Sequence, residues 1–276
     1  LNAIIGFSEI MARERFGPLG TPAYRGYAAD VLRSAEHLLG LINDVLNYAR
    51  LEAGSVRFSM RAVDVPRLVG DSVLLFDGQS GEWRARITTL SRKAAMLTVE
   101  EQTRPQHAEP DLWLLAPVLK RETTEWMVEK ATELGVSRIL LTTSARSAVT
   151  RTNPDRLAAI AIEAAEQCER LTVPGVAAPA PLALVLASWP AGRHLLVGDE
   201  SRTASAAAAV IADAGPGAWA LLVGPEGGFT GGELDGFGKL PFCHRASFGP
   251  RILRAETAAV AGLSLIQALA GDWREP

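Results

Sequence analysis

From Leu112 onward the sequence alternates short apolar runs with longer amphipathic segments, and no other feature constrains the fold as strongly. The predicted strands are 112–119, 138–143, 194–199 and 219–224, and the predicted helices are 122–134, 156–170, 204–214 and a last one ending at 269. Strands that alternate with helices form βαβ units around a mostly parallel sheet. Ligands bind such sheets beyond the carboxyl ends of the strands, so the sequence predicts an α/β domain with its site at that edge.

The segment 221–230, LLVGPEGGFT, ends the last of these predicted strands. Its glycines Gly224, Gly227 and Gly228 allow the backbone to approach a flat ligand closely. A phosphate-binding loop would add Lys and Ser or Thr among the glycines and would avoid an acid. Here Glu226 is the ionisable group of the turn, which favours a neutral or cationic ligand over a polyphosphate. A tight strand-to-loop connection without a ligand is the alternative for this segment alone.

A second segment, FGPRILRAETA at 248–258, begins with a Gly-Pro turn and runs into a predicted buried helix. Packing alone explains its two arginines, Arg251 and Arg254, poorly. They could pair with Glu226 or Glu256, or they could face an anionic substrate.

Together, GPEGGFT and FGPRILRAETA resemble the SPOUT-superfamily methyltransferases that modify uridine N3 in 16S ribosomal RNA, the RsmE type. KRETTEWMVEKATELGV at 120–136 and EAAEQCERLTVP at 163–174 agree with that family in order and spacing, and the resemblance covers about 70–273. It implies an α/β catalytic domain at 109–276 with a C-terminal trefoil knot, a rare exception to unknotted chains. It also implies S-adenosylmethionine as the cofactor, the small ribosomal subunit as the partner, and a homodimer. A cofactor with a sulfonium and no phosphates would tolerate the carboxylate of Glu226.

The resemblance also implies which residues form the site. For the cofactor these are Leu222, Val223, Gly224, Pro225, Glu226, Gly228, Phe248, Gly249, Ile252, Leu253, Arg254 and Thr257. Arg251 or Arg254 is expected to stabilise the charge that develops on the base. Glu256 is the nearest candidate for the group that accepts the N3 proton, with an arginine partner as its alternative role. The residues expected to contact the substrate are Lys120, Arg146, Gln167 and Arg170, of which Gln167 and Arg170 could instead bond neighbouring backbone.

Residues 1–69 predict a helical hairpin of a different kind. LNAIIGFSEIM and SAEHLLGLINDVLNYARLEAG resemble the dimerisation and phosphotransfer hairpin of sensor histidine kinases. In that family the phosphate-accepting histidine lies just upstream of LNAIIGF, where this sequence starts, and His37 lies in the second predicted helix instead. Without that histidine and an ATP-binding region, kinase activity is not expected. The alternative function is a dimerising signalling or scaffold fusion that is catalytically silent, and a joining error in the sequence is equally open.

Between the hairpin and the α/β domain, residues 70–108 contain three β-type runs, at 71–78, 82–90 and 94–102, which predict a small antiparallel sheet. This segment resembles the second part of the PUA-like domain of the same methyltransferases, without its opening strand and helix. A linker at 103–110 follows. The tryptophans Trp83, Trp113 and Trp126 lie in apolar patterns that favour core positions over stacking platforms for bases.

Composition limits the class of protein. The chain has 276 residues, of which 48% are hydrophobic and 21% charged, so it is globular and long enough for two domains. A net charge of −3 excludes an overall basic footprint for nucleic acid but leaves a local basic face possible. Two unrelated cysteines favour a reduced, cytoplasmic setting. The four scattered histidines have no metal-ligand spacing, and no apolar run is long enough to span a membrane, so neither a metal nor a membrane is expected.

Overall fold

The computed structural model describes residues 68–91, 94–201 and 203–274, together with the single positions Ser8, Met11, Ala28 and Val31, each of which is helical. Apart from those four positions, the predicted hairpin lies outside the described residues. The chain divides into two units, Leu1–Asp64 and Val65–Pro276, and both sheets belong to the second unit. No helix in the described part of the chain is both long and apolar enough to cross a membrane.

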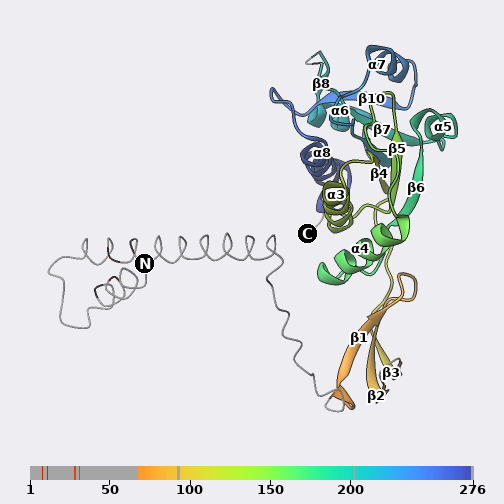
Figure 1. Ribbon diagram of the computed structural model, residues 1–276, viewed down its shortest axis with the longest axis vertical. Coiled ribbons are helices and arrows are strands. Elements are labelled where there is room, and N and C mark those ends of the chain that lie inside the picture. Colours follow the sequence, from red (N-terminus) through yellow and green to blue (C-terminus); the bar gives the residue numbers. More distant parts are fainter. Residues whose placement is uncertain are drawn as a thin grey trace. The chain divides into compact units, whose positions relative to one another are not determined.

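The second unit contains a small antiparallel sheet, then a large parallel sheet with helices (Figure 1). The small sheet consists of β1 (Ser72–Phe76), β2 (Glu82–Leu90) and β3 (Ala95–Arg104). The large sheet consists of β4 (Leu112–Pro117), β5 (Arg138–Thr143), β6 (Gly175–Pro181), β7 (Arg193–Gly198), β8 (Ser205–Ala206), β9 (Ala218–Leu222) and β10 (Cys243–Ser247). The helices are α3 (Arg121–Glu133), α4 (Pro154–Gln167), α5 (Leu182–Ala187), α6 (Ala207–Ala214), α7 (Gly231–Phe237), α8 (Ala255–Ala270) and the short 3-10 helix η2 (Asp272–Arg274).

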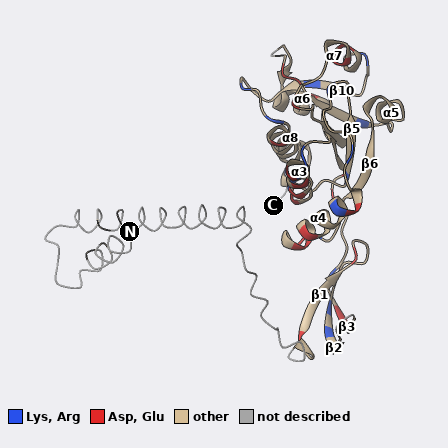
Figure 2. Ribbon diagram, viewed as in Figure 1, with Lys and Arg blue, Asp and Glu red and all other residues tan. Residues whose placement is uncertain are grey.

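In the small sheet, antiparallel pairing of β1 with β2 and of β2 with β3 confirms the predicted meander. Arg84 and Arg86 on β2 form ion pairs with Glu101 and Glu100 on β3, which Figure 2 shows as basic and acidic positions on neighbouring strands. The ion pairs are exposed, so each contributes little to stability. The two glutamates therefore compensate the positive charge that Arg84 and Arg86 would otherwise offer to a nucleic acid.

The large sheet has the strand order β6-β5-β4-β9-β7-β10-β8, and all of its strand pairs are parallel. This confirms the α/β class expected from the alternating pattern. Strand β9 lies between β4 and β7, with Leu221 paired to Leu114 on one side and Leu196 on the other. The carboxyl ends of β9, β7 and β10 therefore meet at one edge of the sheet.

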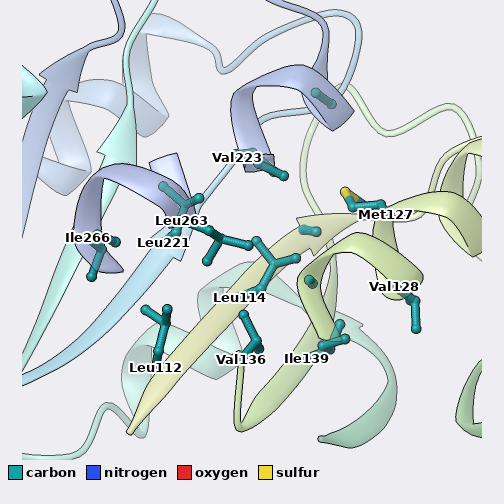
Figure 3. Close-up of a cluster of buried hydrophobic side chains, with 14 of the residues drawn as sticks. Leu112, Leu114, Met127, Val128, Val136, Ile139, Leu221, Val223, Leu263 and Ile266 are labelled. Carbon is teal, nitrogen blue, oxygen red and sulfur yellow. The ribbon is translucent and has the colours of Figure 1, made fainter. Parts of the chain in front are cut away.

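Helices cover both faces of this sheet, as its apolar strands require. On one face, residues of α3, α4, α6 and α8 share one buried cluster with residues of β4 and β9, and Figure 3 shows Leu114, Leu221 and Leu263 lying together in this core. All three side chains are buried, and each contributes about 2 kcal/mol through the apolar area that it removes from water. On the other face, Leu182 of α5 and Phe237 of α7 pack against the alternate residues of the same strands.

The ends of the helices follow local sequence signals. Asn153 caps α4 by accepting a hydrogen bond from the backbone N–H of Arg156, and Pro154 occupies the first turn, where its missing N–H costs nothing. Helix α3 ends just before Gly135, whose φ of +80° confirms the predicted stop. Thr230 and Glu233 form a reciprocal capping box at the start of α7.

Several elements differ from the sequence prediction. The segments that form β6 and β10 were not predicted as strands, because the edge strand β6 contains prolines and β10 contains Cys, His, Arg and Ser in place of an apolar run. The short helices α5 and α7 were also missed. The helix expected at 204–214 begins at Ala207, because the preceding two residues form β8.

One prediction about side chains was wrong: Trp126 was expected in the core but is 42% exposed. Two of the histidines that are scattered in the sequence meet in the fold, because parallel pairing of β7 with β10 brings Nδ1 of His194 to 3.1 Å from Nε2 of His244. Burial, followed by the proximity of His194, lowers the pKa of His244. Among the described residues there is no group of three or more potential metal ligands.

Helix α8 approaches β9 closely because residue 262 is a glycine. A Cβ at Gly262 would lie 2.7 Å from Cδ2 of Leu221 and 3.0 Å from Cζ of Phe248. We expect Gly262→Ala to lower the free energy of unfolding by about 1–3 kcal/mol through overpacking, despite the better helix propensity of alanine. Urea unfolding followed by circular dichroism measures the change.

The matched control for this variant is Gly236→Ala in α7, where an added Cβ meets nothing within 4 Å. We expect that change to be neutral or to stabilise the protein by about 0.5–1 kcal/mol. Equal effects of the two substitutions would contradict the close packing of α8 on β9.

Candidate active site

A hollow lies at the carboxyl ends of β9, β7 and β10. Three loops and the start of α8 surround it. Its lining comprises Gly198, Asp199, Glu200, Val223, Gly224, Pro225, Gly228, Phe229, Leu234, Ser247, Phe248, Gly249, Pro250, Arg251, Ile252, Leu253, Ala255 and Ala258. The position agrees with the edge at which ligands of parallel α/β sheets bind.

Glycines keep the floor of the hollow open. Gly228 has a φ of +66° and Gly249 a φ of +107°, conformations that other residues adopt only with strain. A Cβ at Gly228 would collide with the carboxylate of Glu200, and a Cβ at Gly198 would lie 3.0 Å from the ring of Phe248. Side chains at these positions would fill the space, so the glycines allow a ligand to lie directly against the backbone.

The loop after β7 brings two carboxylates to the hollow. The side chain of Asp199 is completely buried and accepts hydrogen bonds from the backbone N–H of Ser201 at 2.8 Å and from Arg245 Nε at 2.8 Å. Burial raises the pKa of Asp199, but the hydrogen bonds from Ser201 and Arg245 outweigh it and leave the pKa below its ordinary value. Asp199 is therefore a charged anchor that holds this loop onto β10. Its neighbour Glu200 is exposed and free to face a ligand.

The charged groups in the lining are Asp199, Glu200 and Arg251, and the rest is glycine, small or apolar. Asp199 is paired with Arg245, and within the described part of the chain none of the ion pairs involves Glu200 or Arg251. One carboxylate and one guanidinium of the lining are therefore available to a ligand. A polyphosphate would need several cations or a loop of N–H groups with Lys and Ser or Thr. The lining suits a ligand that is largely apolar and carries both a cationic and an anionic group.

Of the residues expected at the cofactor, eight line the hollow: Val223, Gly224, Pro225, Gly228, Phe248, Gly249, Ile252 and Leu253. The other four lie beside it. Leu222 is buried at the end of β9, Glu226 is exposed on the turn, Arg254 is the N-cap residue of α8, and Thr257 is exposed in the first turn of that helix. The two segments singled out in the sequence thus come together, as predicted.

The structure places the expected catalytic residues at the rim of the hollow. Arg251 lines it, Arg254 is exposed at the start of α8, and Glu256 is half-buried in the first turn of that helix. Within the described part of the chain, none of the ion pairs involves any of these three residues. Their charges are consequently available to a ligand, and the alternative in which the arginines pair with Glu226 or Glu256 finds no support.

The four residues expected at the substrate separate into different places. Lys120 is exposed just before α3, and Gln167 is exposed at the end of α4, in a groove beside α3. Arg146, in the loop after β5, donates a hydrogen bond to the backbone oxygen of Gly227 at 2.8 Å and so touches the glycine turn after β9.

Arg170 lies in the interior. It forms an ion pair with Glu109 at 2.6 Å and donates hydrogen bonds to the Thr132 backbone oxygen and to Thr172 Oγ1. Every nitrogen of its guanidinium therefore has a protein partner. The alternative of a bond to neighbouring backbone does not describe this buried ion pair, and the contact of Arg170 with the substrate stays a prediction.

Sequence reasoning missed the contribution of the loop after β7, residues Gly198, Asp199 and Glu200. The available signal was the run HLLVGD, which ends in glycine and acid much as LLVGPEGG does. That run by itself predicts only a strand, because nothing in the sequence alone shows that β7 and β9 are neighbours. Phe229 and Leu234 were missed for the similar reason that α7 was not anticipated.

Comparisons with known proteins agree with this geometry. The RNA methyltransferase domain family matches residues 107–267, more than half of the chain, and the chain belongs to this family. The ribosomal RNA small subunit methyltransferase E of Neisseria gonorrhoeae, solved bound to S-adenosyl methionine, is 29% identical with a TM-score of 0.67, over 82% of this chain and 91% of that one. A probable rRNA-methyltransferase from Porphyromonas gingivalis is 28% identical with a TM-score of 0.64, over 79% and 88% of the two chains.

The amino-terminal segment matches a different family. The His Kinase A phospho-acceptor domain covers residues 1–54. The cell-division control histidine kinase PdhS of Brucella ovis is 44% identical over 87 residues, which is 32% of this chain and 8% of the kinase. The chain thus spans less than a tenth of the kinase that it matches. Both resemblances drawn from the sequence, to the methyltransferases and to the kinase hairpin, are confirmed.

The ion pair of Asp199 with Arg245 makes a prediction about stability and pH. We expect Asp199→Asn to lower the free energy of unfolding by about 3 kcal/mol at pH 7, because it leaves the guanidinium without its buried partner. The folded-state pKa of Asp199 lies below 3.8, so its contribution is complete above pH 3.8 and is lost as the pH falls through the lower folded value. The difference between variant and wild type should therefore shrink in acid.

Urea unfolding of both proteins at pH 7 and at several values below pH 4 measures this. The control is Asp213→Asn on α6, an exposed residue that forms none of the ion pairs in the described part of the chain. A constant difference between Asp199→Asn and wild type across the acid range would refute the assignment.

Proposed function

We propose that the protein catalyses S-adenosylmethionine-dependent methylation of uridine N3 in 16S ribosomal RNA of the small subunit. One observation carries this proposal: a chain of the RNA methyltransferase family has a hollow at the ends of β9, β7 and β10. Glycines line its floor, and its lining lacks the cations that a polyphosphate would need. Its similarity to a small-subunit rRNA methyltransferase solved with S-adenosyl methionine supports the choice of cofactor and substrate.

The lining fits this cofactor. The apolar walls at Phe229, Ile252 and Leu253 suit a flat adenine, and the backbone groups beside Gly224 and Gly249 can read its edge and the ribose. Glu200 offers a carboxylate to a cationic or hydroxyl-bearing part of the ligand. No metal is needed for this arrangement.

The transfer itself sets the tasks of the protein. S-adenosylmethionine supplies a methyl group carried on a positively charged sulfur. A bond from N3 to the methyl carbon forms, the bond from sulfur to that carbon breaks, and the N3 proton leaves the base before or during the attack. Alignment of the three reacting atoms supplies most of the acceleration. In this proposal the hollow holds S-adenosylmethionine, and the residues at its rim orient the uracil base.

Arg251 and Arg254 stand at that rim without ion-pair partners among the described residues. Loss of the N3 proton spreads negative charge onto the two carbonyl oxygens of uracil, and a guanidinium aimed at them stabilises this charge. Glu256, in the first turn of α8, is the candidate that accepts the proton. Lys120 and Gln167 would contact the RNA farther from the reacting base.

The proposal extends to the architecture. We propose that the small sheet β1–β3 is part of a PUA-like domain that helps to hold RNA, and that the enzyme acts as a cytoplasmic homodimer. We also propose a trefoil knot at the carboxyl end. In its support, α8 follows β10, which lies on one side of β7, and packs on β9 and β4 on the other side.

Calorimetric titration with S-adenosylmethionine, followed by a methylation assay on small ribosomal subunits, tests the function. We expect binding, and methylation at uridine N3 identified by mass spectrometry of digested rRNA. Binding without methylation of the subunits would contradict the proposed substrate. The absence of both would favour the catalytically silent dimerising scaffold.

Gly228→Ala tests whether the hollow is the cofactor site. The substitution strains a φ of +66° and pushes the new Cβ into Glu200, so we expect the affinity for S-adenosylmethionine to fall about tenfold or more. The control is Gly232→Ala in α7, where an added Cβ meets nothing within 4 Å and the affinity should not change. An unchanged affinity in Gly228→Ala would place the cofactor elsewhere.

Arg254→Ala separates catalysis from cofactor binding. We expect kcat to fall by about 100-fold or more, as when a group that stabilises developing negative charge is removed, with little change in the affinity for S-adenosylmethionine. Arg254 does not line the hollow, which is why binding should survive. On the same preparation, single-turnover methylation measures the rate of methyl transfer and calorimetry measures the affinity for S-adenosylmethionine. Near wild-type turnover would show that Arg254 does not stabilise the developing charge.

A further inference from the structure

Arg146 lies where the loop after β5 meets the glycine turn of the hollow. Its Nη1 donates hydrogen bonds to the backbone oxygens of Gly227 at 2.8 Å and Phe229 at 3.4 Å. The packing is close as well, because a Cβ at Gly227 would lie 3.2 Å from Cβ of Arg146. Both acceptors belong to the turn after β9. In that turn Pro225, Gly228 and Phe229 line the hollow.

A second contact ties the same two loops together. The backbone N–H of Ala145 donates to Glu233 Oε1 at 3.0 Å, while Glu233 Oε2 accepts from the backbone N–H of Thr230 at 2.7 Å. Burial raises the pKa of Glu233, but these hydrogen bonds and the nearby charge of Arg146 lower it more, so the carboxylate is charged. Glu233 therefore joins the capping box of α7 to the loop after β5.

The rest of the Arg146 guanidinium has no such partner. Among the described residues, no hydrogen bond involves its Nε or Nη2, and Arg146 forms no ion pair. The residue is exposed. A guanidinium that uses one nitrogen on the protein can still present two parallel N–H groups to a phosphate.

We infer that Arg146 is a positioning residue that couples RNA binding to the cofactor turn, with one side of its guanidinium on Gly227 and Phe229 and the other on a backbone phosphate of the substrate. This inference rests on the proposed function for the identity of both ligands. A phosphate that fixes the guanidinium also fixes the two carbonyl groups that it holds. RNA then orders the turn that lines the hollow, and S-adenosylmethionine binds more tightly in its presence. Coupling of this kind is reciprocal.

The test compares Arg146→Ala with wild type in three measurements. Without any ligand, amide hydrogen exchange should become faster at 225–229. The KM for S-adenosylmethionine should rise about tenfold, the effect of one charge-assisted hydrogen bond, with a smaller change in kcat. The tightening of S-adenosylmethionine binding by a saturating 16S rRNA fragment, measured by calorimetry, should disappear.

Arg151→Ala is the matched control, because Arg151 is an exposed arginine of the same loop that lines a different groove, at the starts of α3 and α4. It removes the same charge, and we expect unchanged exchange at 225–229 and an unchanged KM for S-adenosylmethionine. Arg146→Lys keeps the charge but can satisfy only part of the contacts, so it should recover part of the affinity. It also serves in place of Arg146→Ala if that variant does not fold.

The outcomes separate the inference from the proposed function. An Arg146→Ala protein that exchanges like wild type at 225–229 and raises only the KM for RNA would overturn the coupling, even if the wild type methylates small subunits. Faster exchange at this turn with no methylation by the wild type would instead support the contact and reject the proposed substrate.

Discussion

The insertion of β9 between β4 and β7 is the constraint on which the described domain depends. Its backbone hydrogen bonds join strands that are far apart in sequence, and its side chains enter the cores on both faces. Because β9 is central, the turn at 223–228 starts from a rigid strand end and meets the loops after β7 and β10. A glycine at position 262 lets α8 close onto this strand, which brings Arg251 and Arg254 to the same edge.

Two buried arginines at the opposite end attach the segment that leads into the large sheet. Arg193, 5% exposed, bonds the backbone oxygens of Asp111 and Trp219 and the Asp111 carboxylate, and stacks on Trp113 with its guanidinium 3.7 Å from the ring centroid. Arg170 holds Glu109 in a comparable manner. The Arg170–Glu109 pair is buried on both sides, so losing one partner costs more than the pair contributes, since an uncompensated charge is left inside. The end of the sheet that these arginines hold is thus opposite the end at which the hollow lies.

The sequence predicted most of the parallel sheet, because apolar runs such as 138–143 and 219–224 are long enough to stand out from their surroundings. It could not predict β10, whose polar residues are tolerated only through pairing with β7. The two glycine segments of the site were recognisable from their unusual composition and family resemblance. The loop after β7 was not, because its place in the hollow depends on strand order, which local patterns do not encode. Likewise, the contact of Arg146 with Gly227 joins positions 81 residues apart in sequence.

The loops that line the hollow are synthesised in a fixed order along the chain. The segment 198–200 is made first, then 223–229, and after them 247–253 and α8. A growing chain emerges from the ribosome in that order. A chain that has reached only β9 has the strands β4 to β9 but lacks one wall of the hollow. The hollow is therefore completed only after the strands that carry its other walls have been made.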